Sequence, residues 1–164
     1  MSFTNQTLSV LGTVAGTTAL GKHISNQNKE LSLKKVEAEK ELNIAKNELE
    51  KNNFELSTKM ETDKDLTPEQ RDELSKLDAG EDIDKYLEIK SDKALSDAAD
   101  ASSEFNSRLD KYNSGEQKSF PSSKRLDMMK QALQERNDEI TARNTLKANV
   151  ELQRKKLEAL KGVK

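Results

Sequence analysis

The chain of 164 residues contains no cysteine and a single histidine, His23. Without cysteine it can form neither a disulfide framework nor a thiolate metal site, and it has no cysteine nucleophile. His23 has no second histidine with which to hold a metal ion. Asp and Glu are abundant, but they are spread over predicted solvated helix faces with no apolar pocket to raise a pKa. We therefore expect no metal, no cofactor and no enzymatic activity.

Apolar residues are also scarce. Hydrophobic residues make up 32% of the chain and charged residues 35%, with a net charge of −2. Globular domains usually contain roughly 45–50% apolar residues when glycine is included. Many charges of both signs with little apolar surface are typical of long solvated helices with a narrow buried stripe. Since ordering each residue costs roughly 1–2 kcal/mol of backbone entropy, we expect partners or self-association to complete the fold.

Charge is missing altogether from residues 1–21, and the first ionised side chain is Lys22. No basic residue precedes the apolar stretch, which argues against a secretory signal peptide. The stretch is about long enough to span a bilayer, and its small residues would let helix backbones approach closely there. We interpret residues 1–24 as an anchor segment buried against other protein, with membrane contact or a disordered tail as alternatives. Its candidate contact residues are Leu8, Val10, Leu11, Gly12, Val14, Gly16 and Leu20.

The end of this segment partly matches a phosphate-binding loop. Residues 16–22 have the spacing G-x-x-x-x-G-K, but His23 stands where a Ser or Thr hydroxyl would bind Mg²⁺. A P-loop also needs a preceding strand in a parallel sheet, and no strand pattern appears after Lys22. We therefore interpret the glycines as positions for close packing.

Residues 25–60 are predicted to form one long helix with a coiled-coil seam. Apolar residues alternate at spacings of four and three, and one polar residue, Asn52, interrupts the pattern. The seam consists of Ala38, Leu42, Ala45, Leu49, Asn52 and Leu56. Glu and Lys between these positions form a mixed-sign solvated surface.

Residues 67–113 are predicted to form a hairpin-like helical segment. Thr67 is an N-cap, Pro68 occupies the first helical position, and Gln70 completes a capping box. Gly80 is a plausible stop for this short helix. A second helix then runs from about residue 81 to 112. One of its faces carries Ile83, Leu87, Ala94, Ala98, Ala101, Phe105 and Tyr112.

Residues 122–161 are predicted to form the last long helix, with Ser122 or Ser123 as its cap. Two apolar stripes follow one another along it. The first consists of Leu126, Met129, Leu133 and Ile140, and the second of Leu146, Val150, Leu157 and Leu160. The stripes are out of phase by about one residue near Arg143 and Asn144. This offset predicts a stutter or a change of packing partner.

Charge is distributed unevenly. Residues 61–110 contain 16 acidic and 7 basic residues, whereas residues 141–164 contain 7 basic and 2 acidic residues. The basic end is suited to contact with phosphates of nucleic acid or lipid. It also complements the helix dipole, and the acidic region offers it an internal or neighbouring partner. Because no aromatic residues for base stacking lie nearby, nucleic acid is the less favoured partner.

The N-terminal third resembles a known class of phage proteins. The uncharged stretch of residues 8–16, followed by Ile24-Ser25-Asn26-Gln27-Asn28, is similar in pattern to the smaller internal core, or ejection, proteins of short-tailed bacteriophages. The resemblance implies a protein stored in the virion near the portal, released ahead of the DNA, with the apolar part helping to form a conduit. This chain is more charged than that family and lacks its small-residue C-terminal tail.

Together these features predict an all-α protein whose long helices form hairpins or an extended coiled-coil-like bundle. We expect a structural component of a virion that docks by residues 7–21 and packs against copies of itself or other structural proteins. One alternative is a cytosolic scaffold or chaperone. The other is a membrane-tethered coiled coil, with its helices on the side where Lys22 and the following lysines lie.

Overall fold

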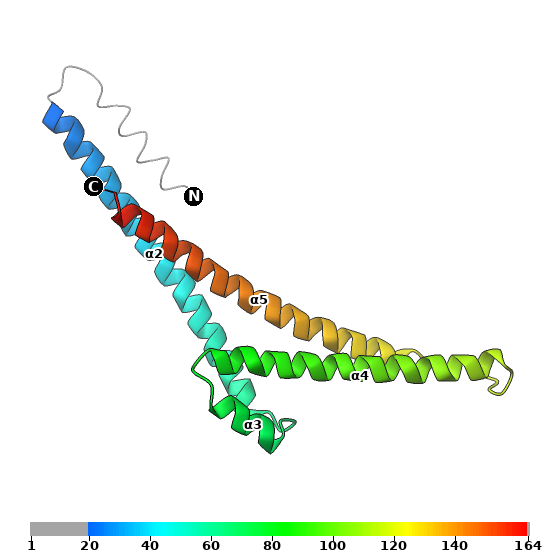
Figure 1. The fold of residues 1–164 in the computed structure, drawn as a ribbon. Helices are drawn as coiled ribbons and strands as arrows, with labels where there is room; N and C mark the ends of the chain where they lie inside the picture. The colour runs from blue at the N-terminus through cyan, green and yellow to red at the C-terminus, as the bar shows by residue number, and fades with distance from the viewer. Residues whose placement is uncertain (1–19, 164) are drawn as a thin grey trace. The chain divides into compact units, whose positions relative to one another are not determined.

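The computed structural model describes residues 20–163, and this part of the chain consists of α-helices and connecting loops without a strand (Figure 1). The predicted all-α class is confirmed. The helices are α2 (Leu20–Thr62), α3 (Pro68–Ser75), α4 (Glu81–Asn113) and α5 (Lys124–Lys161). Helix α2 begins at Leu20, some residues before the expected start at 25. The other anchor residues, Leu8 to Gly16, lie outside the described residues.

The chain divides into two compact units. Unit 1 comprises residues 1–51 and 145–164, and unit 2 comprises residues 52–144. Helices α2 and α5 each contribute to both units, whereas α3 and α4 lie wholly in unit 2. The chain therefore passes from unit 1 to unit 2 within α2 and returns within α5.

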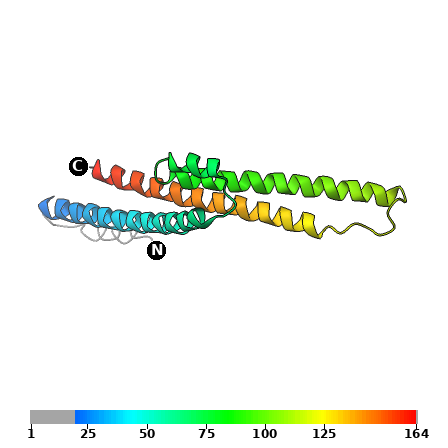
Figure 2. The same ribbon diagram turned by 90° about the horizontal axis from the view of Figure 1, so that it is seen from below.

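Unit 1 is an antiparallel pair formed by the first part of α2 and the last part of α5, which lie side by side in both views (Figures 1 and 2). Its core is a narrow apolar stripe, in which small alanines on α2 face larger side chains on α5. The buried residues are Ala38, Leu42, Ala45, Val150 and Leu157, with Leu49 and Leu160 packed against them.

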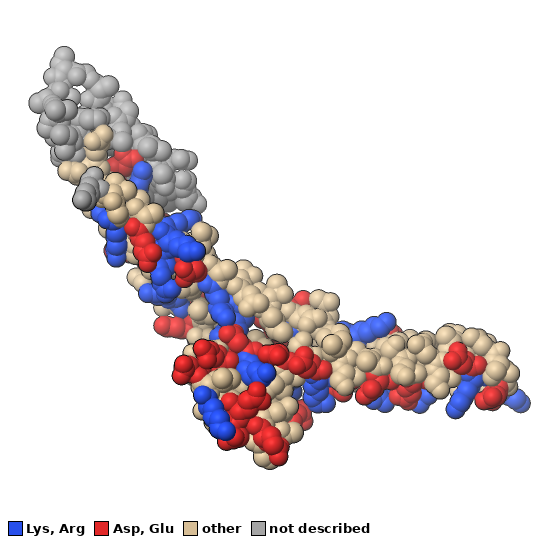
Figure 3. Space-filling model, viewed as in Figure 1, with Lys and Arg blue, Asp and Glu red and all other residues tan. Residues whose placement is uncertain are grey.

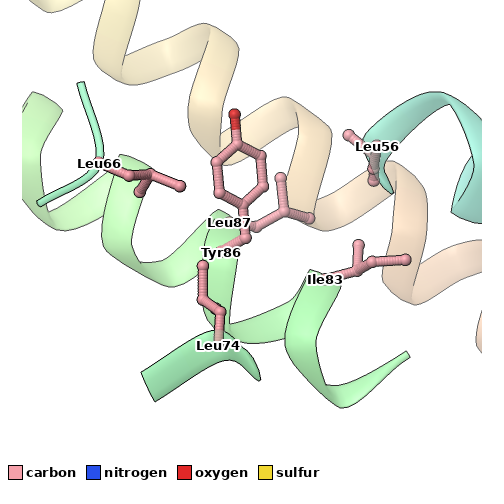
Figure 4. Close-up of a cluster of buried hydrophobic side chains, with 6 residues drawn as sticks. All are labelled: Leu56, Leu66, Leu74, Ile83, Tyr86 and Leu87. Atoms are coloured by element: carbon pink, nitrogen blue, oxygen red, sulfur yellow. The ribbon is translucent and has the colours of Figure 1, made fainter. Parts of the chain in front are cut away.

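Unit 2 contains an antiparallel hairpin of α4 and α5, with α3 and the end of α2 beside the start of α4 (Figure 2). Its buried cluster draws on several elements and includes one aromatic ring (Figure 4). The cluster consists of Leu56, Leu66, Leu74, Ile83, Tyr86 and Leu87, with Met60, Leu77, Ile89 and Ile140 packed against it.

Local sequence signals explain where the short helix begins. The Gln70 amide donates to Thr67 Oγ1 at 3.1 Å, and the Thr67 amide donates to Gln70 Oε1 at 3.0 Å, so the capping box is complete. Gly80, which precedes α4, has φ of 97°, a conformation that L side chains rarely adopt. The predicted cap at Thr67 is confirmed. The prediction that Gly80 stops the short helix is wrong, because α3 ends at Ser75 with Lys76 as its C-cap and Gly80 is instead the N-cap of α4.

The buried face of α4 differs from the predicted one in two respects. Tyr86 and Lys90 are buried in addition to Ile83, Leu87 and the alanines. Tyr112, expected on the same stripe, is exposed at the end of the helix. Tyr86 lies three residues after Ile83 and Lys90 three residues after Leu87, so both lie near this face of the helix. Both can be buried there because Asp63 supplies a polar partner to each.

Candidate functional site

The predicted seam residues of unit 1 come together between α2 and α5. Leu42, Val150 and Leu157 are buried, and Leu49 and Leu160 are half-buried against them. Ala45 is only 1% exposed, so the two helices approach closely at this point. Part of the α2 seam and part of the second stripe of α5 therefore form one intramolecular surface.

The remaining seam residues lie along α2 and α5. Leu56 is buried in the unit 2 cluster, and Ile140 packs against that cluster. Leu126 is buried near the start of α5, whereas Met129, Leu133 and Leu146 are half-buried.

Arg143 is the most completely buried charged residue among the described side chains, at 2% exposure. Its Nε donates to Asp84 Oδ1 at 2.6 Å, and its Nη1 donates to Asn52 Oδ1 at 2.9 Å and Asn53 Oδ1 at 2.6 Å. Its Nη2 donates to the Gly80 carbonyl at 3.3 Å. A single guanidinium thus joins α5, α2, α4 and the loop before α4. Its fixed fork of donors is suited to this role, because lysine offers only a point charge.

The position of Arg143 follows from heptad counting. On α2, Ala45 and Ala38 lie seven and fourteen residues before Asn52. On α5, Val150 and Leu157 lie seven and fourteen residues after Arg143. All four apolar residues belong to the buried stripe of unit 1. Arg143 therefore occupies a seam position and meets Asn52, the predicted polar member of the facing seam. Arg143 interrupts the apolar pattern and so is not part of the predicted stripes, although it lies seven residues before Val150.

The offset between the two stripes of α5 coincides with this residue. The boundary between the units lies between Asn144 and Thr145. Beyond it α5 packs on α2. Before it α5 still bonds to α2, through Arg143 and Asn52, and it also bonds to α4, through Asn137 Oδ1 and the Ser91 hydroxyl at 3.2 Å. The structure shows a change in the packing of α5 at this point: α4 is added to α2 as a neighbour on the unit 2 side of the boundary.

A second polar network surrounds Asp63, just after α2. Its carboxylate accepts hydrogen bonds from the Tyr86 hydroxyl at 2.8 Å, the Asp65 amide at 2.9 Å and Lys90 Nζ at 3.0 Å. Its backbone carbonyl accepts from Arg71 of α3. Burial alone would raise the pKa of Asp63, but these donors outweigh it and the pKa is lowered. Burial, together with the hydrogen bond to Asp63, raises the pKa of Tyr86 well above its usual range.

These networks are suited to structural work. In both, a buried or half-buried charge is saturated by partners from different elements, which fixes the relative placement of those elements within unit 2. Neither offers a free nucleophile beside a base. No group of three or more histidine or acidic side chains is placed to hold a metal ion in the described part of the chain.

The outer face of α2 in unit 1 is apolar at three positions. Leu33, Val36 and Ile44 are 48%, 60% and 49% exposed. They share one face, because three and eleven residues correspond to about one and three helical turns. Leu33 and Leu42 are nine residues apart, about two and a half turns, so this face lies opposite the buried seam. We call these three residues the outer stripe of α2.

Among residues 20–163, no helix combines the length and the apolar character that a membrane crossing requires. Comparison with protein families, with curated proteins and with solved structures found no match.

Proposed function

We propose that this chain is a non-enzymatic structural protein of a larger assembly, which it joins through residues 7–21 and through the surface of its helices. The observation that carries the proposal is the outer stripe of α2. Three large apolar side chains on one face of a charge-rich helix are about half exposed, although the opposite face already has its partner. Burial of apolar surface contributes roughly 25 cal/mol per Å², so a neighbour that covers the stripe stabilises the helix.

The proposed assembly is a bacteriophage virion, in which the chain is an internal core, ejection, portal-associated or tail-associated component. The support for this location is the likeness of residues 8–16 and 24–28 to internal proteins of short-tailed phages. The long charged helices also suit a protein that packs beside copies of itself, because they offer an extended surface relative to their mass.

A double substitution tests the role of the outer stripe. We expect Val36→Lys with Ile44→Lys to abolish incorporation of the chain into its native particle while helix content by circular dichroism is retained. The matched control is Leu152→Lys, a single 50% exposed leucine on α5 of the same unit. Equal incorporation of the double variant and the control would reject the outer stripe as an assembly surface.

Deletion of residues 1–21 tests the anchor and separates the alternatives. The structural proposal predicts that the deleted chain stays helical and no longer enters the particle. A scaffold or chaperone would bind its client unchanged without these residues. A membrane-tethered protein would lose flotation with vesicles on deletion, and the intact chain would resist carbonate extraction.

A further inference from the structure

The tip of the α4–α5 hairpin carries an exposed pair of aromatic rings. Tyr112 lies at the end of α4, and Phe120 lies in the loop that leads to α5. Their centroids are 5.4 Å apart, with the ring planes at 78° in an edge-to-face arrangement. Tyr112 is 38% exposed and Phe120 is 63% exposed. The pair thus holds a rigid apolar projection in solvent at the end of a long hairpin.

The surroundings of this pair are basic, although unit 2 as a whole is acidic. Residues 52–144 contain 22 acidic and 15 basic residues, whereas residues 108–125 at the tip contain five basic and two acidic residues. Arg108 and Arg125 both pair with Glu104. Lys111, Lys118 and Lys124 are exposed, and no acidic side chain pairs with them in the described part of the chain. The hairpin tip therefore presents two aromatic rings next to positively charged side chains.

Unit 2 also contains a groove of the opposite character beside α3. The groove, of about 320 Å³, is lined by the apolar side chains of Met60, Leu66 and Leu74 and by Glu61 and Asp82, together with Arg71 and Ser75. Residues 61–82 contain nine acidic and three basic residues. Acidic side chains gather over α3 in the space-filling view (Figure 3). An apolar floor with an acidic surround complements an aromatic tip with a basic surround.

The two surfaces cannot meet within one molecule. Asp82 lies at the start of α4 and Tyr112 at its end, and the thirty residues between them span about 45 Å along the helix. Any contact between tip and groove therefore needs two copies of the chain.

We propose that the hairpin tip of one copy docks into the α3 groove of a second copy, with Phe120 on the floor of Leu66 and Leu74. Lys111 and Lys118 then face Glu61 of the groove lining and Asp78, whose backbone carbonyl accepts a hydrogen bond from the amide of Asp82, another lining residue. This inference rests on the proposed function and deepens it, because it identifies one neighbour as the same chain. Each copy offers one tip and one groove, so the contact is heterologous and extends into a ring or an open row.

A charge-swap experiment on the full-length chain tests this contact. The tip variant is Lys111→Glu with Lys118→Glu, and the groove variant is Glu61→Lys with Asp78→Lys; all four residues are exposed. We expect the wild type to self-associate in sedimentation velocity at low salt and each variant alone to associate at least about tenfold more weakly. An equimolar mixture of the two variants should recover association, because each then offers the surface that the other lacks.

A substitution that changes no charge tests the contribution of the Phe120 ring. Phe120→Ser should weaken self-association at least about tenfold, with the circular dichroism spectrum unchanged, because the ring is exposed. Self-association that neither the charge variants nor Phe120→Ser reduces would overturn the contact and leave the assembly function intact. A monomeric wild type would also overturn it. So would tip variants that lose binding to anionic phosphatidylglycerol vesicles while self-association is unchanged, since the tip would then be a membrane surface.

Discussion

Helices α2 and α5 each contribute to both units, yet the interactions that stabilise the interior of each unit differ. In unit 2, buried side chains from α2, α3 and α4 form one cluster, against which Ile140 of α5 packs. Arg143 and Asp63 link these elements by charge-assisted hydrogen bonds. In unit 1, α2 and α5 meet along a stripe of alanine, valine and leucine. The ion pairs of Lys34 with Glu30 and of Arg154 with Glu151 in this unit each join neighbours on a single helix.

The difference indicates which part of the chain specifies the fold. Buried polar groups with fixed partners penalise alternative registers, whereas a smooth apolar seam tolerates sliding. A pair of helices buries little surface, so unit 1 is expected to open more readily than unit 2. Unit 1 also has more basic than acidic residues, 13 against 8, whereas unit 2 has more acidic than basic ones. Unit 1 is thus the part that gains most from a neighbour.

Removal of the Arg143 guanidinium should cause the largest loss of stability, and the loss should fall on unit 2. Arg143→Met leaves the partly buried side chains of Asp84, Asn52 and Asn53 without their shared donor. We expect the free energy of unfolding of unit 2 to fall by about 2–4 kcal/mol, below the range for a fully buried pair because Asp84 is 40% exposed. Urea unfolding and amide hydrogen exchange of α4 measure the loss.

The matched control for Arg143 is Arg154, an arginine of the same helix that is 47% exposed and pairs with Glu151 three residues away. Arg154→Met should change the stability by less than about 0.5 kcal/mol. If the two substitutions cost the same, Arg143 is not the residue that ties unit 2 together.

The helices and their ends were largely predictable from sequence. Thr67, Pro68 and Gln70 form the expected cap because their side chains satisfy orphan amides locally, without help from distant residues. The seam of α2 was also predictable, because apolar residues at alternating spacings of three and four can be recognised within the sequence of a single helix. Residues such as Ala45 and Leu42 accordingly lie in the buried stripe.

The polar networks were not predictable by the same route. Asp63 and Tyr86 are 23 residues apart, and Asn52 and Arg143 are 91 apart, so only the tertiary arrangement shows that they bond. A buried lysine such as Lys90 cannot be distinguished from a solvated one until its carboxylate partner is located. The offset in α5 marks the position at which its packing changes, but it does not identify α4 as the added neighbour.

The seam of unit 1 can be tested by adding volume where the helices approach most closely. Ala45→Leu places three more carbon atoms at a position that is 1% exposed, and we expect it to destabilise unit 1 by about 1–3 kcal/mol. The effect should be confined to amides of unit 1 in hydrogen exchange. Ala148→Leu, at an exposed alanine of α5 in the same unit, is the control and should leave exchange unchanged. Faster exchange throughout unit 2 would contradict the separation of the units.

The smallest expected effect is the loss of the Asp63 contribution to stability at acid pH. Because the pKa of Asp63 is lowered in the folded protein, its contribution to stability is complete above the ordinary carboxyl pKa of about 3.9 and is lost as the pH falls through the lowered value. Asp63→Asn removes the charge that Lys90 and the Tyr86 hydroxyl share. We expect it to lower the free energy of unfolding by about 1–2 kcal/mol near neutral pH. Since asparagine does not titrate, the difference from wild type should shrink towards acid.

Tyr86→Phe distinguishes the hydrogen bond from the packing of the ring. The ring remains in the unit 2 cluster while the donor to Asp63 disappears, so the Asp63 pKa should move back towards its ordinary value. NMR titration of the Asp63 carboxyl carbon measures this pKa directly. In unit 1, the exchange rates of α5 amides should be the same in this variant as in wild type. An unchanged pKa in Tyr86→Phe would mean that Lys90 and the Asp65 amide hold the charge without the tyrosine.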